Sequence, residues 1–535
     1  MDAKPLIHPL EEANLELLSH VHPKQWRNPD GDEVYDLLVI GAGTAGLVTA
    51  SGAARLGARV ALIERALMGG DCLNVGCVPS KSLLRAARVV GEIRKGEVLG
   101  ISVGAVKVNF GEIMRRMRLR RADISSHDSA QRVTSLGIDV FFGDAQFTGP
   151  VEVAVNGQRL RFKRAVIATG TSPAVPSIPG LINTSYLTNE TLFGLTERPS
   201  RLVIIGGGPI GCEMAQAFVR FGSEVTVLDL SPQLLPREDR DAAEVVADQL
   251  RHDGVRTELG LRVKLVKPRL DGVEVQFERD GVQSKVIGDQ LLVATGRTPN
   301  VATLNLRAAG VAYSQQGVVV DDRLRTSAAR IFAAGDVCSS LRFTHAADAM
   351  ARIVIQNALL FGRRSARALV IPWCTYTDPE IAHVGLYEQE AQEQGRRVAT
   401  LTIPLSDVDR ALIDEEANGF VRVHHDRGKL LGCTIVARHA GEMIGEAAYI
   451  ITHGGSLADL SATIHPYPTH FDGFSSKSSS IEYSESVSIC CLLNAPLFTD
   501  FKAEDNSFIL LIPTKTLDDN LFPRQNLNAK SVKVS

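Results

Sequence analysis

The 535-residue chain has no apolar run long enough to cross a membrane, no excess of basic residues and no segment dense in cysteine. A membrane-spanning helix needs roughly 20 consecutive apolar residues, a length that no run approaches. The 58 basic and 61 acidic residues give a net charge of −3, which leaves no global electrostatic basis for nucleic-acid binding. The sequence therefore predicts neither a membrane protein nor a nucleic-acid-binding protein.

The first residues also lack the pattern of a targeting signal. They contain no apolar core, and the acidic residues Glu11 and Glu12 follow soon after. The 8 cysteines are scattered rather than arranged as a secreted disulfide framework. We therefore expect a cytoplasmic protein, in which a disulfide is more often catalytic than structural. A cluster of arginines at residues 115–121 has the spacing of one helix face, which we expect to be solvated.

What the chain does have is a Gly-rich segment with two cysteines five positions apart, GGDCLNVGCVPSK at residues 69–81. Pro79 and the run after it predict a helix that begins at or just after Cys77. A helix N-terminus lowers the pKa of a thiol and favours the thiolate, which is the reactive form in disulfide exchange and a soft metal ligand. The segment predicts a redox-active dithiol. Two buried structural cysteines or half of a zinc site are the alternatives, although no second ligand pair lies nearby.

An apolar, β-prone run at residues 34–40 leads into a GxGxxG motif formed by Gly41, Gly43 and Gly46. A helical stretch follows, and then a short second strand ends at Glu64. This order is the dinucleotide-binding fingerprint. Its glycines allow a tight turn, close approach of the backbone to a pyrophosphate, and close helix–strand packing, and its acid accepts hydrogen bonds from ribose hydroxyls.

The same unit occurs a second time. A strand at residues 201–205 precedes Gly206, Gly208 and Gly211, and a further strand ends at Asp229. The first glycine and the acid are 23 residues apart in both copies. Two fingerprints in one chain predict electron transfer from a nicotinamide to a flavin.

Three further apolar strands end in short glycine-containing turns. The first two end at Thr169-Gly170 and at Gly296, where we expect the chain to cross between domains. The third ends at Asp336, which we expect to approach the sugar chain of a ligand. Each motif taken alone indicates only a turn.

Together these motifs resemble the FAD-dependent pyridine nucleotide–disulfide oxidoreductases, and within them the mercuric reductase-like proteins without an N-terminal heavy-metal-binding domain. The resemblance covers about residues 34–469, and residues 69–81 are its most specific part. It implies an α/β fold with two Rossmann-like dinucleotide-binding domains, for FAD and for NAD(P), and a C-terminal α+β dimerisation domain. It also implies a homodimer whose active sites are shared between subunits, one FAD per subunit, and NADH or NADPH as co-substrate.

The resemblance further implies domain boundaries, and we expect the Ser-rich C-terminal tail to be weakly ordered. The domains are an N-terminal extension at 1–33, an FAD-binding domain at 34–185 and 290–365, an NAD(P)-binding domain at 186–289, an interface domain at 366–472 and the tail at 473–535.

Site residues follow from the same resemblance. Cys72 is implied to be the interchange thiol that meets the substrate, and Cys77 the charge-transfer thiol against the flavin. Lys81 is implied to approach the flavin and to pair with Glu213. The remaining implied contacts are Gly143, Thr169, Gly170, Asp336 and His345 for FAD, and Gly296 for the nicotinamide side.

The C-terminal motif bears on the substrate. In disulfide reductases a catalytic His stands where this chain has Tyr467, within the HPYPT segment at residues 465–469. A His of pKa about 6.5 suits proton transfer to and from sulfur, whereas a Tyr of pKa about 10 does not. A metal ion held by the dithiol needs no such base, so Tyr467 favours a soft acceptor such as thiol-bound Hg(II). Alternatively, His465 or His470 supplies the base.

Two features leave alternatives open. The adjacent Cys490 and Cys491 resemble the vicinal pair by which mercuric reductases capture Hg(II), but their apolar flanks also fit a buried structural pair. Asp229 favours the free 2′-hydroxyl of NADH, whereas Arg220 and Arg237 could meet the 2′-phosphate of NADPH.

The leading hypothesis is thus a mercuric reductase-like NAD(P)H oxidoreductase with FAD and a Cys72–Cys77 redox pair. One alternative is a reductase of a small disulfide, such as glutathione reductase or dihydrolipoamide dehydrogenase. The other is an inactive flavoprotein relative that acts as a redox sensor or binding module.

Overall fold

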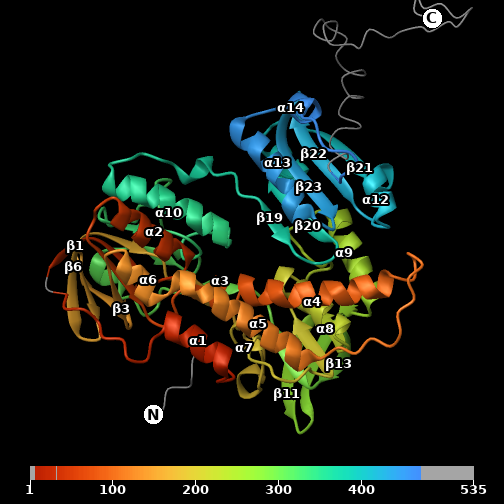
Figure 1. The fold of residues 1–535 in the computed structure, drawn as a ribbon, viewed down its shortest axis with the longest axis horizontal. Helices are drawn as coiled ribbons and strands as arrows, with labels where there is room; N and C mark the ends of the chain where they lie inside the picture. The colour runs from red at the N-terminus through yellow and green to blue at the C-terminus, as the bar shows by residue number, and fades with distance from the viewer. Residues whose placement is uncertain (1–6, 32, 471–535) are drawn as a thin grey trace, which may run out of the picture. The chain divides into compact units, whose positions relative to one another are not determined.

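The structure is a computed structural model, and it describes residues 7–31 and 33–470 (Figure 1). The predictions made for the tail at 473–535, and for Cys490 and Cys491, lie outside the described residues. Within those residues, no helix combines the length and apolar character that crossing a bilayer requires.

The first dinucleotide-binding unit is built on a seven-stranded sheet in which β3, β2, β1 and β6 run parallel in that order. The short strand β18 pairs in parallel with the C-terminal end of β6. The N-terminal end of β6 pairs with β5, and β5 pairs with β4, in an antiparallel meander. Helices α2 and α10 pack side by side against this unit (Figure 1). The bounds are β1 Val34–Ile40, α2 Thr44–Arg55, β2 Val60–Glu64, α6 Ala130–Ser135, β3 Ile138–Phe142, β4 Ala145–Gly149, β5 Glu152–Val155, β6 Gln158–Ile167, β18 Ile331–Ala333 and α10 Thr344–Leu359.

The second unit repeats this arrangement. Its parallel strands follow the order β10-β9-β8-β14, and β11, β12 and β13 form an antiparallel meander. The central strands are buried along most of their length, as expected for a parallel sheet with two covered faces. The bounds are α7 Asn189–Leu192, β8 Arg201–Ile205, α8 Pro209–Arg220, β9 Glu224–Leu228, α9 Arg240–Asp253, β10 Arg256–Glu258, β11 Arg262–Arg269, β12 Gly272–Arg279, β13 Val282–Gly288 and β14 Gln290–Val293.

Short strands connect the two units and close the first. Strands β7 (Thr171–Pro173) and β15 (Arg297–Pro299) form an antiparallel pair. They directly follow Gly170 and Gly296, where the chain was predicted to cross between domains. A second small pair is formed by β16 (Tyr313–Ser314) and β17 (Gly317–Val318). The two Rossmann-like units predicted from the sequence are both present.

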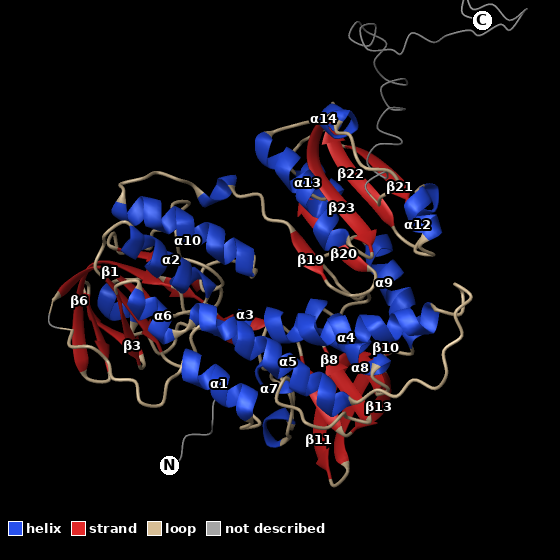
Figure 2. Cartoon of the chain, in the orientation of Figure 1, coloured by secondary structure: helices blue, strands red, loops and turns tan. Residues whose placement is uncertain are grey.

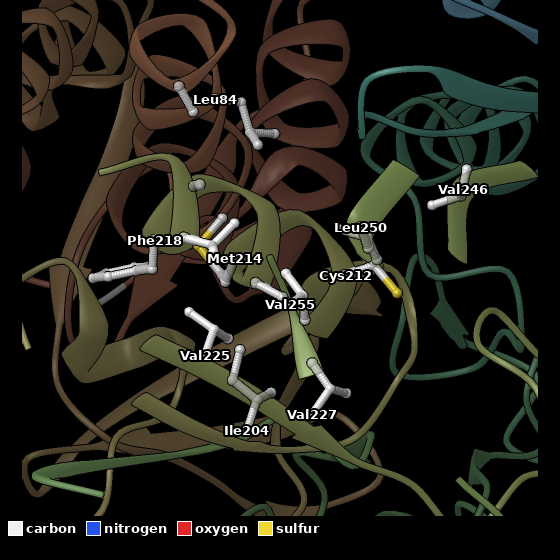
Figure 3. Close-up of a cluster of buried hydrophobic side chains, with 14 of the residues drawn as sticks. Leu84, Ile204, Cys212, Met214, Phe218, Val225, Val227, Val246, Leu250 and Val255 are labelled. Atoms are coloured by element: carbon white, nitrogen blue, oxygen red, sulfur yellow. The ribbon is translucent and has the colours of Figure 1, made fainter. Parts of the chain in front are cut away.

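Helix α4, which begins with the second cysteine of the dithiol, shares a core with the second unit. Helix α3 spans Gly70–Asn74, α4 spans Cys77–Lys95 and α5 spans Phe110–Ser125. Leu84 of α4 belongs to the same buried cluster as Met214 and Phe218 of α8 (Figure 3). Full burial of such side chains contributes about 1.5–3 kcal/mol each. This cluster therefore fixes the dithiol helix to the second dinucleotide unit.

The C-terminal part is a five-stranded antiparallel sheet in the order β19-β20-β23-β22-β21, with α13 packed on it (Figure 2). This is the predicted α+β domain. The bounds are β19 Trp373–Thr375, β20 Glu380–Gly385, α11 Glu388–Glu393, β21 Ala399–Pro404, α12 Asp409–Ile413, β22 Phe420–Asp426, β23 Lys429–Ala437, α13 Ala440–His453 and α14 Leu457–Ala462.

The N-terminal segment packs against the first unit. Helix α1 (Glu12–Val21) packs along α5, and its Leu17 and Val21 are fully buried in the core of that unit. The prediction of a solvated arginine face on α5 is wrong for two residues: Arg118 and Arg121 are 3% and 1% exposed. They are buried because α1 covers this side of α5.

Candidate active site

The two cysteines lie on neighbouring helices, with Cys72 in α3 and Cys77 as the first residue of α4. The predicted helix start at Cys77 is confirmed. Both are free thiols that hydrogen-bond to each other, and the Cys77 Sγ is also 3.4 Å from the Oγ1 of Thr344. Since Thr344 is the first residue of α10, the Cys77 sulfur lies at one helix N-terminus and beside another. Both helix dipoles favour negative charge there.

The two thiols have opposite acidities. The hydrogen bond from Cys72 lowers the pKa of Cys77 to about 6. The hydroxyl of Thr344 and the charge of Lys81 also lower this pKa, whereas desolvation raises it. The same hydrogen bond and burial raise the pKa of Cys72. Near neutral pH the pair therefore holds one proton on Cys72 and a thiolate on Cys77.

Lys81 lies one turn along α4 from Cys77 and pairs with Glu213 of α8. Its Nζ is 3.1 Å from Oε1 and 2.9 Å from Oε2 of that carboxylate, which is buried. The backbone N–H of Tyr376 donates to Oε1 at 3.0 Å, and the Lys81 Nζ lies 4.4 Å from the centre of the Tyr376 ring. Tyr376 was not singled out from the sequence, because nothing local in β19 or the turn after it marks this contact.

The first glycine loop has the backbone that its motif requires. Gly41 has φ +102°, and a Cβ on Gly46 would lie 1.8 Å from the Gly41 carbonyl oxygen. A Cβ on Gly43 would come no closer than 3.8 Å to another residue, so that position is open to a ligand. Glu64 accepts 2.7 Å hydrogen bonds from the backbone N–H groups of Ala42 and of Ala66, and burial raises its pKa.

Several predicted flavin contacts come together around this loop. One cavity is lined by Gly41, Glu64, Gly143, Thr169 and the unpredicted Asn300. The Asn300 amide donates to the Thr169 carbonyl at 2.9 Å, while the Thr169 hydroxyl donates to the Asn300 carbonyl at 2.8 Å. This combination of an open glycine loop, a buried acid and amide groups fits the adenosine end of FAD.

The remaining predicted flavin residues have different surroundings. Asp336 follows β18, accepts a 3.2 Å hydrogen bond from the Thr171 hydroxyl, and has a pKa raised by burial. Gly170 adopts φ +63°. His345 is directed to the Pro372 carbonyl, with its Nε2 at 2.6 Å, and it is the neighbouring Thr344 that reaches the dithiol.

Arg297 is a site residue that the sequence did not single out. It directly follows Gly296, whose φ is +132°, and its guanidinium pairs with Asp71, the residue before Cys72. Its Nε also donates to the Thr171 hydroxyl at 2.6 Å. The signal available in the sequence was its place directly after the Ala-Thr-Gly strand exit.

The second glycine loop has the same geometry as the first. Gly206 has φ +117°, a Cβ on Gly211 would lie 1.9 Å from the Gly206 oxygen, and Gly208 faces open space. The Asp229 carboxylate accepts from the backbone N–H of Gly207, as Glu64 does from Ala42. Open glycine positions and a matching acid fit a nicotinamide dinucleotide.

One of the two arginines considered for a 2′-phosphate is not available. Arg220 is 2% exposed, and its guanidinium is held at 2.8 Å by each of Asp253 and Asp378. That prediction is wrong because the arginine bridges α9 and the segment before β20. Arg237 lies 5.1 Å from the centre of the Trp373 ring.

Tyr467 is 73% exposed on the C-terminal domain, and its hydroxyl donates to Asp409 at 2.8 Å. The two alternative bases each lie beside a carboxylate: His465 Nε2 is 3.0 Å from Glu446, and His470 Nε2 is 3.4 Å from Asp414.

Known proteins resemble the chain along most of its length. The family model for pyridine nucleotide-disulphide oxidoreductases matches residues 35–351, and the model for their dimerisation domain matches residues 371–477. Mercuric reductase from Staphylococcus aureus is 36% identical over 87% of this chain and 85% of its own length. Dihydrolipoyl dehydrogenase from Thermus scotoductus is 33% identical over 82% of this chain and 96% of its own.

Among solved structures, the HOCl-induced flavoprotein disulfide reductase RclA from Escherichia coli matches with a TM-score of 0.73 and 31% identity, over 82% of this chain and 98% of that one. The family uses FAD and NAD(P)H, and the dimerisation domain indicates a homodimer. On the strength of these matches and of the paired glycine loops and dithiol, the chain belongs to the pyridine nucleotide-disulphide oxidoreductase family.

Proposed function

We propose that this flavoenzyme reduces a soft metal ion presented as a thiol complex, of which Hg(II) is the leading candidate. The observation that carries the proposal is Tyr467 at the place of a catalytic His, in a chain whose dithiol holds a thiolate on Cys77. The similarity to proteins named mercuric reductase supports it. FAD, when bound, supplies the two-electron relay from NAD(P)H to an acceptor held by the dithiol.

The protonation state of the dithiol suits capture of such a complex. The Cys77 thiolate displaces one thiolate from the metal, and Cys72 displaces the second and passes its proton to a departing thiolate. The exchange balances without a general base, since two protein sulfurs replace two small-molecule sulfurs and one proton moves with them. A metal ion of this softness prefers thiolate ligands.

We further propose that Tyr467 acts on the dithiol of the other subunit. Its exposed phenol lies on the domain whose family model describes dimerisation. In this proposal the FAD-binding domain comprises 34–185 and 290–365, the NAD(P)-binding domain 186–289 and the interface domain 366–472. The partner's Tyr467 then completes the site over Cys72.

The test is anaerobic NAD(P)H oxidation by the dimer with HgCl₂ in excess small thiol. We expect strong stimulation and release of Hg(0), and a loss of about tenfold in the Tyr467→Phe variant, which is the scale of one net hydrogen bond. The absence of Hg(II)-stimulated oxidation, together with rapid reduction of glutathione disulfide or lipoamide, would falsify the proposal.

The pair formed by His465 and Glu446 favours a second candidate, the reductase of a small disulfide. His465 is close to a carboxylate that could orient it, as an acid–base His requires. RclA, named as a flavoprotein disulfide reductase, supports the same candidate. If it is correct, His465→Asn lowers disulfide turnover at least about a hundredfold while NAD(P)H still reduces the flavin.

A further inference from the structure

Arg121 of α5 is a buried cation attached to the dithiol segment. It is 1% exposed, and one guanidinium nitrogen donates to the backbone carbonyl of Asn74 at 2.6 Å. A second nitrogen donates to the side-chain oxygen of Asn14 at 2.7 Å. Both hydrogen-bond acceptors are neutral groups. Burying a charge against neutral partners is costly, so its position calls for a specific role.

Asn74 lies between the two cysteines, at the end of α3. Its side-chain amide donates to the carbonyls of Met68 at 2.9 Å and of Gly70 at 2.8 Å, which closes the segment on itself. Its own backbone carbonyl accepts a hydrogen bond from the Arg121 guanidinium. Arg121 therefore holds, from outside, the backbone that joins Cys72 to Cys77.

Asn14 belongs to a part of the chain that we call the N-terminal brace, residues 7–31. Its amide donates to the Pro9 carbonyl at 2.7 Å, which fixes the orientation of the oxygen offered to Arg121. At the other end of α1 the Val21 carbonyl accepts from the Met68 N–H at 3.0 Å, so the brace also contacts the residue directly before the dithiol segment. The brace therefore reaches this part of the chain in two ways, through Arg121 and through Met68.

We propose that Arg121 is a positioning residue for the dithiol, and that the N-terminal brace works through it. Asn14 holds Arg121, Arg121 holds the Asn74 carbonyl, and this contact keeps Cys72 within hydrogen-bonding reach of Cys77. The proposal does not depend on the identity of the electron acceptor.

The consequence is measurable because the Cys72 hydrogen bond is the main cause of the acidic pKa of Cys77. When Arg121 or its anchor is lost, the Asn74 carbonyl turns to other partners and the sulfurs separate for part of the time. The thiolate then loses its donor, and the pKa of Cys77 moves up toward the value of about 8.5 for a free thiol.

The experiment uses the full-length holoenzyme, reduced anaerobically, in the variants Arg121→Met, Arg121→Lys and Asn14→Ala. Two pH titrations are made: the long-wavelength thiolate–flavin absorbance, and the rate of alkylation of each cysteine by iodoacetamide, read by mass spectrometry. We expect the Cys77 midpoint to rise by about one pH unit in Arg121→Met, on the scale of measured thiol shifts. Asn14→Ala and Arg121→Lys should give smaller rises.

Arg118→Met is the matched control. Arg118 is also buried in α5 and also reaches the brace, with Glu11 at 3.2 Å, but its other partner is the Leu195 carbonyl at 2.7 Å. We expect it to lower thermal stability without moving the Cys77 midpoint. An unchanged midpoint in folded Arg121→Met, or an equal shift in Arg118→Met, overturns the proposal. If Arg121→Met does not fold, an unchanged midpoint in Asn14→Ala overturns it instead.

Discussion

The two dinucleotide-binding units have the same backbone arrangement. They differ in the returning segment, which is the later stretch of chain whose backbone hydrogen-bonds to the glycine loop. In the first unit the Ala42 carbonyl accepts from the Gly69 N–H at 2.8 Å, and in the second the Gly207 carbonyl accepts from the Leu235 N–H at the same distance. The returning segment carries the dithiol in one case and leads to Glu238 in the other. The two units therefore have the same backbone arrangement, but the segments that hydrogen-bond to their glycine loops carry different functional side chains.

The surroundings of the returning segments differ as well. Gly70 packs on the first loop so closely that a Cβ there would lie 2.7 Å from the Gly43 Cα. In the second unit Glu238 faces the C-terminal domain, where its carboxylate accepts from the Trp373 indole at 3.0 Å and from the Tyr387 hydroxyl at 2.7 Å. The returning segment of the first unit carries the two cysteines, and that of the second unit contacts the C-terminal domain.

The largest expected effect concerns the segment that distinguishes the first unit. Cys77→Ser should lower acceptor-dependent NAD(P)H oxidation by about a thousandfold or more and abolish the thiolate–flavin absorbance, because both need its thiolate. Cys72→Ser should abolish turnover while the absorbance persists. Cys433→Ala, a change in the core of the C-terminal domain, is the control that should keep both.

A second prediction tests whether the two loops are independent. Gly46→Ala and Gly211→Ala each place a Cβ under 2 Å from a carbonyl oxygen, so the local backbone must shift. We expect Gly46→Ala to lose FAD, and Gly211→Ala to keep FAD but reduce it at least about a hundredfold more slowly with NAD(P)H. The measurements are the ratio of FAD to protein and the rate of flavin reduction. Loss of FAD in both variants would show that the loops are coupled.

The third prediction uses the acidity of the dithiol. The pKa of Cys77 is lowered to about 6, so its thiolate is present above that pH and is protonated as the pH falls through it. The thiolate–flavin absorbance of the reduced enzyme should therefore be half lost near pH 6. A midpoint above about 8, close to the ordinary thiol value, would contradict the asymmetry that sets this unit apart.

The smallest expected effect distinguishes the influence of the Lys81 charge on the pKa of Cys77 from that of its partner Glu213. The charge of Lys81 lowers the pKa of Cys77, whereas that of Glu213 raises it. Lys81→Met should therefore raise the midpoint of the absorbance titration, and Glu213→Gln should lower it, each by less than about one unit. Shifts in the same direction would mean that the ion pair acts as a structural clamp rather than as two separate charges.

The parts that could be predicted from sequence are those with a local pattern. The glycine loops, their strands and the helix start at Cys77 follow from neighbours in the chain. The burial of Arg121 and Arg220 could not be predicted in this way, because their partners Asn14 and Asp378 lie 107 and 158 positions away. Charge spacing shows which arginines share a helix face, but not which distant element covers it.

The local sequence pattern also predicts only part of the role of the two acids at the end of the second strand of each unit, Glu64 and Asp229. Glu64 and Asp229 were expected to receive ribose hydroxyls, and in the structure each carboxylate already accepts a backbone N–H from its own glycine loop. A carboxylate has further lone pairs, so this contact leaves room for a sugar. The acid therefore shapes the loop before any ligand arrives, a role that the spacing alone could not reveal.

The hydrogen bond between Gly69 and Ala42 has a consequence for protein engineering. Because the dithiol segment is bonded to the first glycine loop, and Gly70 touches Gly43, neither segment can change its backbone alone. A chimera that imports residues 69–81 from another family member should carry residues 41–46 from the same donor. The two stretches form a single inheritable module, although more than twenty positions of chain separate them.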